Sequence, residues 1–333
     1  MTAMSTSDVA TFIEPGTSGG HRFVVGGLSI LERVIRACGA RGVRRVEVPC
    51  EPIDVARGGV AHGVDVVWLA PDALPDAGQP VVRGDEVAGV RVVDDASRRR
   101  AEWAVLRGLP KSHQGATDAL INWRASLRIT RALARTPLRP NHVAVAATVL
   151  GLIAWALALT DTALGLAGAG LLLQLHSILD SCDGELARLR YQFSRLGEWL
   201  DNVTDEIVDD GFAVCAGVVA GGPWLWLGVL GGARALAVIV QGVDTYRRTG
   251  SGNPYAFRYW FERVDATPAE VWDRASALYW LRALGRRDTY VFLWMLLCLA
   301  GQPAAIAAYA GALGGLTLAL TAIHLAVQAG RRR

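Results

Sequence analysis

The chain has 333 residues, is 52% hydrophobic and carries a formal net charge of +3. A charge this small gives no support to a nucleic-acid-binding protein. Charged residues are frequent before residue 140 and sparse after it, which predicts a soluble α/β domain followed by an all-α membrane domain. Five cysteines without zinc-site spacing predict no disulfide framework, and the polar first 20 residues predict no cleavable signal peptide.

The first part of the chain is expected to form a small α/β domain over residues 22–113, after a disordered tail at 1–21. Helical spacing and the turn residues Gly39, Gly108 and Pro110 predict helices at 30–38 and about 96–107. Apolar β-branched runs predict strands at 43–48, 64–69 and 90–93. Alternating strands and helices of this length favour a parallel sheet.

A basic amphipathic helix is expected next, within residues 114–139. Its arginines lie 4, 3 and 4 positions apart and so share one helix face: Arg124, Arg128, Arg131 and Arg135. Such a face is compatible with a simply solvated helix. Because an apolar stretch follows directly, we favour a helix lying at an anionic membrane surface.

The remainder, residues 140–333, is predicted to be a six-helix transmembrane domain. A span needs about 20 mainly apolar residues, and the candidates are 141–160, 162–179, 203–220, 223–243, 289–300 and 303–327. The short loops at Asp161, Gly221 and Gly301 carry no Lys or Arg, whereas the connections on the other side are rich in Arg. The positive-inside rule therefore predicts a multi-pass protein of the cytoplasmic membrane with both termini cytoplasmic.

Four carboxylates stand at the junction of the second and third predicted spans. Asp180 and Asp183 are three residues apart, and Asp201 and Asp205 are four apart, so each pair shares a helix face. An antiparallel hairpin would bring both pairs to the cytoplasmic membrane surface. Since like charges and desolvation oppose such a cluster, we expect one or two hard divalent ions there, Mg²⁺ or Mn²⁺ and not zinc.

The full pattern around these acids, D-x2-D-G-x2-A-R-x8-G-x3-D-x3-D, spans residues 180–205. It resembles the signature of the CDP-alcohol phosphotransferase family at all eight fixed positions. A chance match of this length is far rarer than that of a short motif. Any single Asp of this pattern is best interpreted as an ordinary solvated residue. The whole pattern is not, because all eight positions match.

The resemblance implies a cytosol-facing active site that transfers a substituted phosphate from a CDP-alcohol to a hydroxyl acceptor and releases CMP. It implies two Mg²⁺ ions, with Mn²⁺ able to substitute, held by Asp180, Asp183, Asp201 and Asp205, and Asp205 as the catalytic base. It further implies donor contacts from a larger set of residues: Asp183, Gly184, Ala187, Arg188, Ser194, Gly197, Pro140 and Asn141.

The sequence around the motif, together with Arg286-Arg287-Asp288, looks most like the di-myo-inositol-phosphate-phosphate synthase branch. This favours inositol or an inositol phosphate as acceptor, a polyol or phosphorylated alcohol. The run from Val25 to Val34 resembles the GGxxLLERV segment of sugar nucleotidyltransferases. The glycine-rich GxGxRL loop that should precede it is missing, so the N-terminal domain is interpreted as a truncated, nucleotidyltransferase-like relic or scaffold.

Two other functions remain open. One is a phospholipid synthase that uses CDP-diacylglycerol, and the other is a catalytically inactive membrane protein that binds lipid. Loss of a motif carboxylate would indicate inactivity, and none is lost. The resemblance also allows a homodimer. Arg234, in mid-span, is expected either to bind acceptor phosphate or to pair with Asp209 or Asp210.

Overall fold

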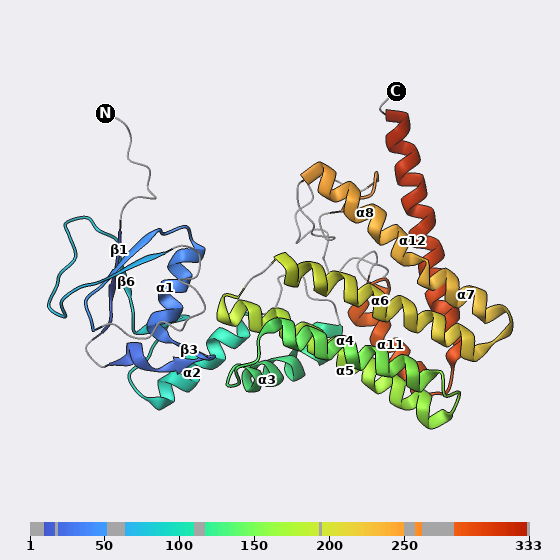
Figure 1. The fold of residues 1–333 in the computed structure, drawn as a ribbon, viewed down its shortest axis with the longest axis horizontal. Coiled ribbons are helices and arrows are strands. Elements are labelled where there is room, and N and C mark those ends of the chain that lie inside the picture. The colour runs from blue at the N-terminus through green and yellow to red at the C-terminus, as the bar shows by residue number, and fades with distance from the viewer. Residues whose placement is uncertain are drawn as a thin grey trace. The chain divides into compact units, whose positions relative to one another are not determined.

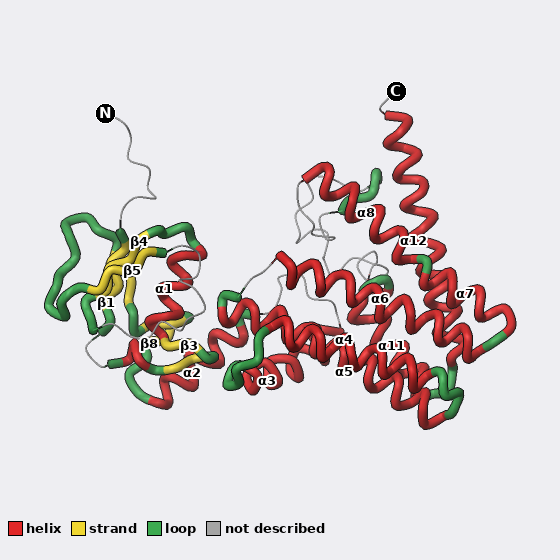
Figure 2. The backbone as a smooth tube through the Cα atoms, in the orientation of Figure 1, coloured by secondary structure: helices red, strands yellow, loops and turns green. Residues whose placement is uncertain are grey.

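The computed structural model describes residues 10–16, 19–51, 64–109, 117–192, 195–249, 257–261 and 283–331, without the side chains of 119, 195–202, 249 and 331. The chain divides into two compact units. Unit 1 comprises residues 1–110, 127–140 and 182–193, and unit 2 comprises 111–126, 141–181 and 194–333. Figure 1 follows the elements along the chain, and Figure 2 shows that the described strands all belong to the N-terminal part.

A four-stranded parallel sheet forms the centre of unit 1, in the order β5-β4-β1-β6. β1 (Thr11–Glu14) pairs with β4 (Arg45–Val48) and β6 (Val81–Arg83), and β5 (Asp65–Trp68) pairs with β4. The predicted parallel sheet is therefore confirmed. The disordered tail expected at residues 1–21 is wrong over β1, because Thr11, Phe12 and Ile13 are buried in this sheet.

Two short hairpins accompany the sheet. β2 (Val24–Val25) pairs antiparallel with β3 (Leu28–Ser29), after a single 3-10 turn at Gly20–Arg22. β7 (Glu86–Val87) pairs antiparallel with β8 (Val90–Arg91). The strand predicted at 90–93 is thus present only as half of a two-residue hairpin, outside the parallel sheet.

Both predicted helices of the N-terminal region are confirmed. α1 (Ile30–Ala40) begins at Ser29, whose side chain accepts a hydrogen bond from the Glu32 amide. α2 (Asp95–Arg107) begins with a capping box between Asp94 and Ser97. Such caps satisfy amides that have no partner within the helix. Ile30 and Leu31 of α1 pack into the core under the sheet.

Unit 1 also takes in two segments from farther along the chain: the end of α3 (Trp123–Leu133) and the end of α5 (Ala163–Arg190). Arg131 of α3 binds Glu102 of α2 through Nε and Nη2, at 2.9 and 2.6 Å. The two units therefore interleave along the chain, whereas the sequence predicted consecutive domains at 22–113, 114–139 and 140–333. Long-range pairs such as Arg131–Glu102 account for the difference.

The described part of unit 2 is helical. A single turn of π-helix at Asp118–Asn122 leads into α3, and the longer helices are α4 (Pro140–Ala158), α5, α6 (Arg195–Ala220), α7 (Gly222–Gly232), α8 (Arg234–Thr249), α11 (Arg287–Leu299) and α12 (Pro303–Arg331). Its core is built around Phe212 of α6 and Trp294 of α11, whose rings stack with centroids 6.2 Å apart.

Four stretches of the described helices are long and apolar enough to cross a membrane: 140–158, 163–190, 222–248 and 303–330. They correspond to the first, second, fourth and sixth predicted spans. The third predicted span lies in α6, which carries several acidic residues, and the fifth lies in α11, which has 13 residues. The count of six spans therefore stays a prediction.

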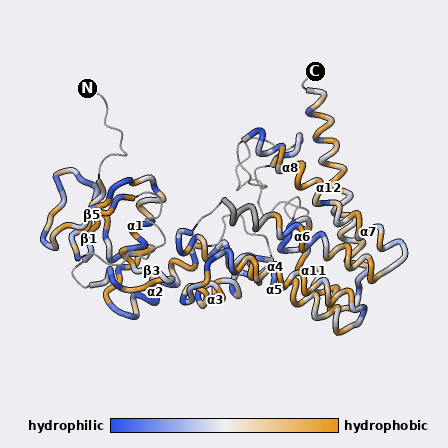
Figure 3. The backbone as a smooth tube through the Cα atoms, in the orientation of Figure 1, coloured by the Kyte–Doolittle hydropathy of each residue, from blue (hydrophilic) through white to orange (hydrophobic). Residues whose placement is uncertain are grey.

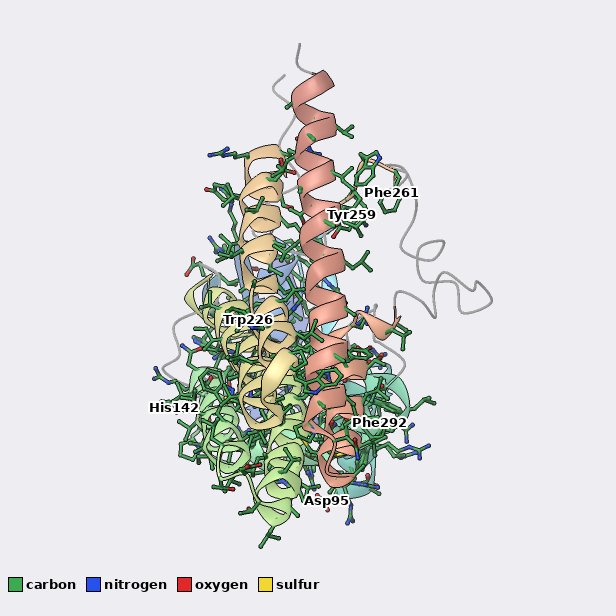
Figure 4. The ribbon with its side chains drawn as sticks, turned by 90° about the vertical axis from the view of Figure 1, so that its right-hand side faces the viewer. Asp95, His142, Trp226, Tyr259, Phe261 and Phe292 are labelled. Atoms are coloured by element: carbon green, nitrogen blue, oxygen red, sulfur yellow. The ribbon has the colours of Figure 1, made fainter. Side chains whose placement is uncertain are left out.

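The surfaces of the candidate spans are apolar. Figure 3 shows orange, hydrophobic stretches along α7 and α12, and Trp226 of α7, labelled in Figure 4, is 73% exposed. Other exposed apolar residues include Leu164, Leu236 and Leu316. Because lipid solvates such side chains and a helix satisfies its own backbone, these faces suit a membrane protein.

Small residues let the helices of unit 2 approach closely. A Cβ added to Gly231 of α7 would lie 2.7 Å from the Ala310 Cβ of α12, and one added to Gly217 of α6 would lie 3.0 Å from the Gly228 Cα. Close contact through glycine is typical of helix packing in membranes. These contacts set the spacing of α7 against α12 and against α6, which carries several of the acidic residues.

Candidate active site

The motif residues lie on two helices, as their spacing predicted. α5 carries Asp180, Asp183, Gly184, Ala187 and Arg188, and α6 carries Gly197, Asp201 and Asp205. Ser194 and the side chain of Asp201 lie outside the described residues. Pro140 and Asn141 begin α4.

Asp180 and Asp205 meet at one guanidinium, that of Arg287 at the start of α11. Arg287 Nη1 lies 2.5 Å from Asp180 Oδ2 and 2.7 Å from Asp205 Oδ2. Arg287 Nε lies 2.8 Å from Asp209 Oδ2, one helical turn beyond Asp205. The three carboxylates and the guanidinium together carry a formal charge of −2, within a largely apolar helical unit.

His176, one turn before Asp180 on α5, completes the surroundings of Arg287. Its Nδ1 is 2.9 Å from the Ala147 carbonyl and must donate there, so its Nε2 is the acceptor for Arg287 Nη2 at 2.7 Å. His176 is therefore neutral in this arrangement. Its Nε2 also lies 3.9 Å from Asp205 Oδ1. Both ring nitrogens of His176 therefore have protein partners.

A second charge network adjoins the first. Arg234 donates to Asp210 Oδ1 at 3.0 Å and to Glu206 Oε2 at 2.6 Å, which agrees with the expected pairing with an acid of the third span. Tyr290 links the two networks, because its hydroxyl donates to Asp209 at 2.8 Å and accepts from Arg234 at 3.3 Å. Arg234 is thus engaged with acids and a phenol.

Arg286 and Asp288 flank Arg287 in sequence, and Asp288 contacts the start of the helical segment that leads into α3. Asp288 Oδ2 accepts hydrogen bonds from the amides of Thr117 and Asp118, at 3.1 and 3.2 Å, and Asp288 Oδ1 accepts from Arg286. Burial, followed by the nearby Asp288 carboxylate, raises the pKa of the Asp118 carboxyl. The Arg286-Arg287-Asp288 run therefore has a distinct contact for each member.

The other motif residues of α5 lie in the part of this helix that belongs to unit 1. Asp183 is buried there. Arg188 Nε donates to the Leu109 carbonyl at 2.8 Å, so this predicted donor-binding arginine also has a structural contact. Arg190 donates to the carbonyls of Thr136 at 2.6 Å and Ala134 at 3.0 Å, as well as to Leu133 and Leu138. Arg190 thus caps the end of α3.

A family model of CDP-alcohol phosphatidyltransferases matches residues 138–323, more than half of the chain. The chain belongs to the CDP-alcohol phosphatidyltransferase family. The family resemblance carried by residues 180–205 is thereby confirmed, and the match covers both α5 and α6 in full. Membership of this family implies transfer of phosphate-containing groups, and the four apolar helices suggest a membrane protein.

Several curated relatives of this chain share one name, bifunctional IPC transferase and DIPP synthase. Identity to the Thermococcus kodakarensis protein is 33% over 205 residues, which cover 60% of this chain and 41% of that protein. The Rubrobacter xylanophilus protein is 36% identical over 172 residues, covering 49% and 35%. The Aquifex aeolicus protein is 38% identical over 92 residues, covering 28% and 20%. The chain therefore spans less than half the length of these relatives.

CDP-alcohol phosphatidyltransferases generally use divalent metals. The donor set fits a hard cation, because Asp180 and Asp205 present oxygen atoms to a single positive group and the surrounding acids leave negative charge in excess. Among the described side chains, no group of three or more His, Cys, Asp or Glu is arranged to hold a metal. Asp201, one of the expected ligands, is outside that set, and Arg287 occupies the space between two others.

Sequence reasoning did not assign Arg287, Asp209 or Tyr290 to the site. Arg287 was noted only within the Arg286-Arg287-Asp288 run and the Arg-rich connections, with no role at the site. One signal for Asp209 was available: Asp201, Asp205 and Asp209 follow one another at intervals of four, which continues the same helix face.

Proposed function

We propose that the protein is a Mg²⁺-dependent transferase that moves a substituted phosphate group from a CDP-alcohol to a hydroxyl acceptor and releases CMP. One observation carries this proposal beyond family membership. Asp180 and Asp205, which the motif assigns to metal binding, come from different helices and lie within 2.7 Å of the same guanidinium nitrogen. Carboxylates this close need positive charge nearby, because repulsion and desolvation both oppose them.

In this proposal Asp180, Asp183, Asp201 and Asp205 hold the metal, as two Mg²⁺ ions or Mn²⁺ in their place. Bound ions would neutralise the phosphate oxygens and the departing CMP. Asp205 removes the proton of the acceptor hydroxyl. That oxygen then bonds to the distal phosphorus, and the bond from this phosphorus to the CMP oxygen breaks.

Binding of the CDP part is assigned to the end of α5 and its neighbours: Asp183, Gly184, Ala187, Arg188, Ser194, Gly197, Pro140 and Asn141. The position of Gly184 supports this assignment, since the nearest atoms to a Cβ added there are those of the Arg188 guanidinium, at 3.3–3.9 Å, so two of the assigned residues lie side by side. The site and both chain termini are proposed to face the cytoplasm, on the side of the Arg-rich connections.

The acceptor is proposed to be a polyol or phosphorylated alcohol, with inositol or an inositol phosphate favoured. The shared name of the relatives, which includes DIPP synthase, supports this choice. The Arg-rich connections offer four candidates for binding acceptor phosphate: Arg190, Arg195, Arg247 and Arg248. Arg190 is a poor candidate, because its guanidinium is committed to backbone carbonyls, and Arg248 pairs with Asp244 at 3.0 Å.

The reaction is tested by CMP release from the full-length protein in detergent or vesicles. Asp205→Asn is expected to retain donor binding and to lower turnover by about 10²–10⁴-fold, the usual contribution of a general base. Asp161→Asn, an exposed acid in the loop after α4, serves as the matched control. Near-normal turnover of Asp205→Asn contradicts the assignment, as does full activity after exhaustive chelation. Mg²⁺ or Mn²⁺, but not Zn²⁺, should restore the chelated enzyme.

The substrate class is tested by supplying soluble CDP-inositol or CDP-diacylglycerol with labelled inositol, inositol phosphate or glycerol phosphate. A water-soluble phosphodiester supports the proposed polyol reaction. A lipid-phase product supports the alternative, a phospholipid synthase that uses CDP-diacylglycerol. Absence of CMP release with every pair supports the remaining alternative, an inactive lipid-binding protein. Measurement of the protein's mass in detergent tests whether it forms a homodimer.

A further inference from the structure

The guanidinium of Arg287 is held by partners on two other helices. Nη1 contacts Asp180 and Asp205, Nε contacts Asp209, and Nη2 contacts His176, all within 2.8 Å. The planar fork of an arginine suits several acceptors at fixed directions, which a lysine cannot match. Arg287 is therefore the positive centre of this cluster in the described structure.

Two of these four partners coincide with the proposed metal ligands. Mg²⁺ binds oxygen at about 2.0–2.1 Å and prefers a near-octahedral shell. Arg287 Nη1 lies 2.5 Å from Asp180 Oδ2 and 2.7 Å from Asp205 Oδ2. An ion bound to these two oxygens would therefore lie very close to Nη1. Two cations at that separation repel strongly where water is scarce. The guanidinium and the metal ion thus compete for the same oxygens.

The other two partners are independent of the metal. Asp209 and His176 are not in the proposed ligand set, and both face the opposite edge of the guanidinium, through Nε and Nη2. His176 presents a neutral acceptor there, because its Nδ1 donates to Ala147. Arg287 can therefore leave Asp180 and Asp205 while it keeps two of its contacts.

We propose that Arg287 is a built-in counter-cation of the metal site, which neutralises Asp180 and Asp205 when no divalent ion is bound and gives up those two contacts when one binds. This inference rests on the proposed metal site. Arg287 keeps the acids together in the metal-free protein, and its displacement lowers the affinity for metal. Arg287 is then a positioning residue for the metal ligands, and it adjusts the metal concentration at which the enzyme becomes loaded.

The test compares Mn²⁺ binding and thermal unfolding of the full-length protein with Arg287→Gln. The dissociation constant for Mn²⁺, measured by electron paramagnetic resonance, should fall by about tenfold or more in the variant, since a competing unit charge at contact distance is removed. The metal-free variant should unfold at a lower temperature than the wild type. Saturating Mn²⁺ should raise its melting temperature by more than it raises that of the wild type.

Arg234→Gln is the matched control, because it removes another largely buried arginine, one that contacts Glu206 and Asp210 rather than Asp180 and Asp205. It should lower the melting temperature with and without Mn²⁺ alike. Arg287→Lys retains the charge and should fall between wild type and Arg287→Gln in Mn²⁺ affinity. An Arg287 variant that folds only when Mn²⁺ is present also supports the proposal, because the ion then replaces the missing positive charge.

Three results overturn the proposal. Unchanged or weaker Mn²⁺ binding by Arg287→Gln means that Arg287 does not compete with the ion. Equal destabilisation with and without Mn²⁺ means that Arg287 is only structural, and so does failure of both Arg287 variants to fold under either condition. A wild type that binds no Mn²⁺ and gains no stability from it refutes the metal site itself, and the exchange with it.

Discussion

Arg33 of α1 donates a hydrogen bond through Nη1 to the backbone carbonyl of Leu189, 156 residues later, at 2.8 Å. Its Nη2 donates to the Val25 carbonyl of the β2–β3 hairpin at 2.7 Å. Arg36, one turn along α1, adds a bond to the Arg190 carbonyl. Unpaired carbonyls at the end of a helix need such donors. The N-terminal domain thus holds the last turn of α5, which supports the scaffold interpretation.

Arg33→Met should loosen the end of α5. Each buried carbonyl left without its donor costs about 1–3 kcal/mol, so the free energy of unfolding should fall. Hydrogen exchange of residues 182–190 in the full-length protein should accelerate. Arg41→Met, at the exposed end of the same helix, is the control and should leave this exchange unchanged. Equal protection in both variants would falsify the scaffold role of Arg33.

The α2 cap should make local stability depend on pH. Hydrogen bonds from the Ser97 side chain and amide hold the pKa of Asp94 below its ordinary value. A lowered pKa in the folded state means that the cap stabilises above about pH 4 and that this contribution is lost as the pH falls further. At neutral pH, Asp94→Ala should speed exchange of the first α2 amides roughly several-fold.

The difference between wild type and Asp94→Ala should shrink at pH 3. Asp94→Asn retains an acceptor without a titrating group and should show a weaker pH dependence than the wild type. A difference between wild type and Asp94→Ala that persists at pH 3 would argue against the ionised cap.

The glycine contact between α7 and α12 should tolerate no added methyl. In Gly231→Ala the new Cβ would lie 2.7 Å from the Ala310 Cβ, and overpacking of this kind typically costs about 1–3 kcal/mol. Gly242→Ala in α8 is the control, since nothing lies within 4 Å of its added Cβ. It should be neutral or stabilising by up to about 1 kcal/mol. Thermal unfolding in detergent measures both, and equal melting temperatures contradict the prediction.

The N-terminal domain should lack nucleotidyltransferase activity. It has the GGxxLLERV-like segment but not the GxGxRL loop, and a nucleotide site needs backbone amides that cradle phosphate. The full-length protein, given CTP and a phosphorylated alcohol, should release no pyrophosphate above background. Release that depends on both substrates would show that the domain is an active cytidylyltransferase.

Local patterns predicted the helices of the N-terminal region well, because periodicity and capping act over a few residues. The same reasoning missed β1, whose four residues lie between polar and Gly-rich stretches and are buried only by β4 and β6. Local sequence patterns also could not predict that the two units interleave along the chain. That feature depends on pairs such as Arg131–Glu102, 29 residues apart, which leave no local periodicity.

At the site, the motif spacing placed Asp180 and Asp205 on separate helices, and the structure brings them together. Arg287 could not be located in this way. Its partners Asp209 and His176 lie 78 and 111 residues away in sequence, and several other arginines of the basic connections look equally suitable. Only the packing of α11 against α5 and α6 distinguishes it from them.

The pairing of Arg234 with Glu206 and Asp210 has a consequence for biosynthesis. The acids lie on α6, before the turn at Gly221, and the arginine follows that turn, 24 residues after Asp210 and 28 after Glu206. On translocon scales, an isolated charge at the bilayer centre costs about 2.5–3.5 kcal/mol. These charges compensate one another only once both helices have been synthesised. We therefore expect α6 to leave the translocon together with α7 and α8, as one hairpin, so that the later-translated segment determines how well the earlier one inserts.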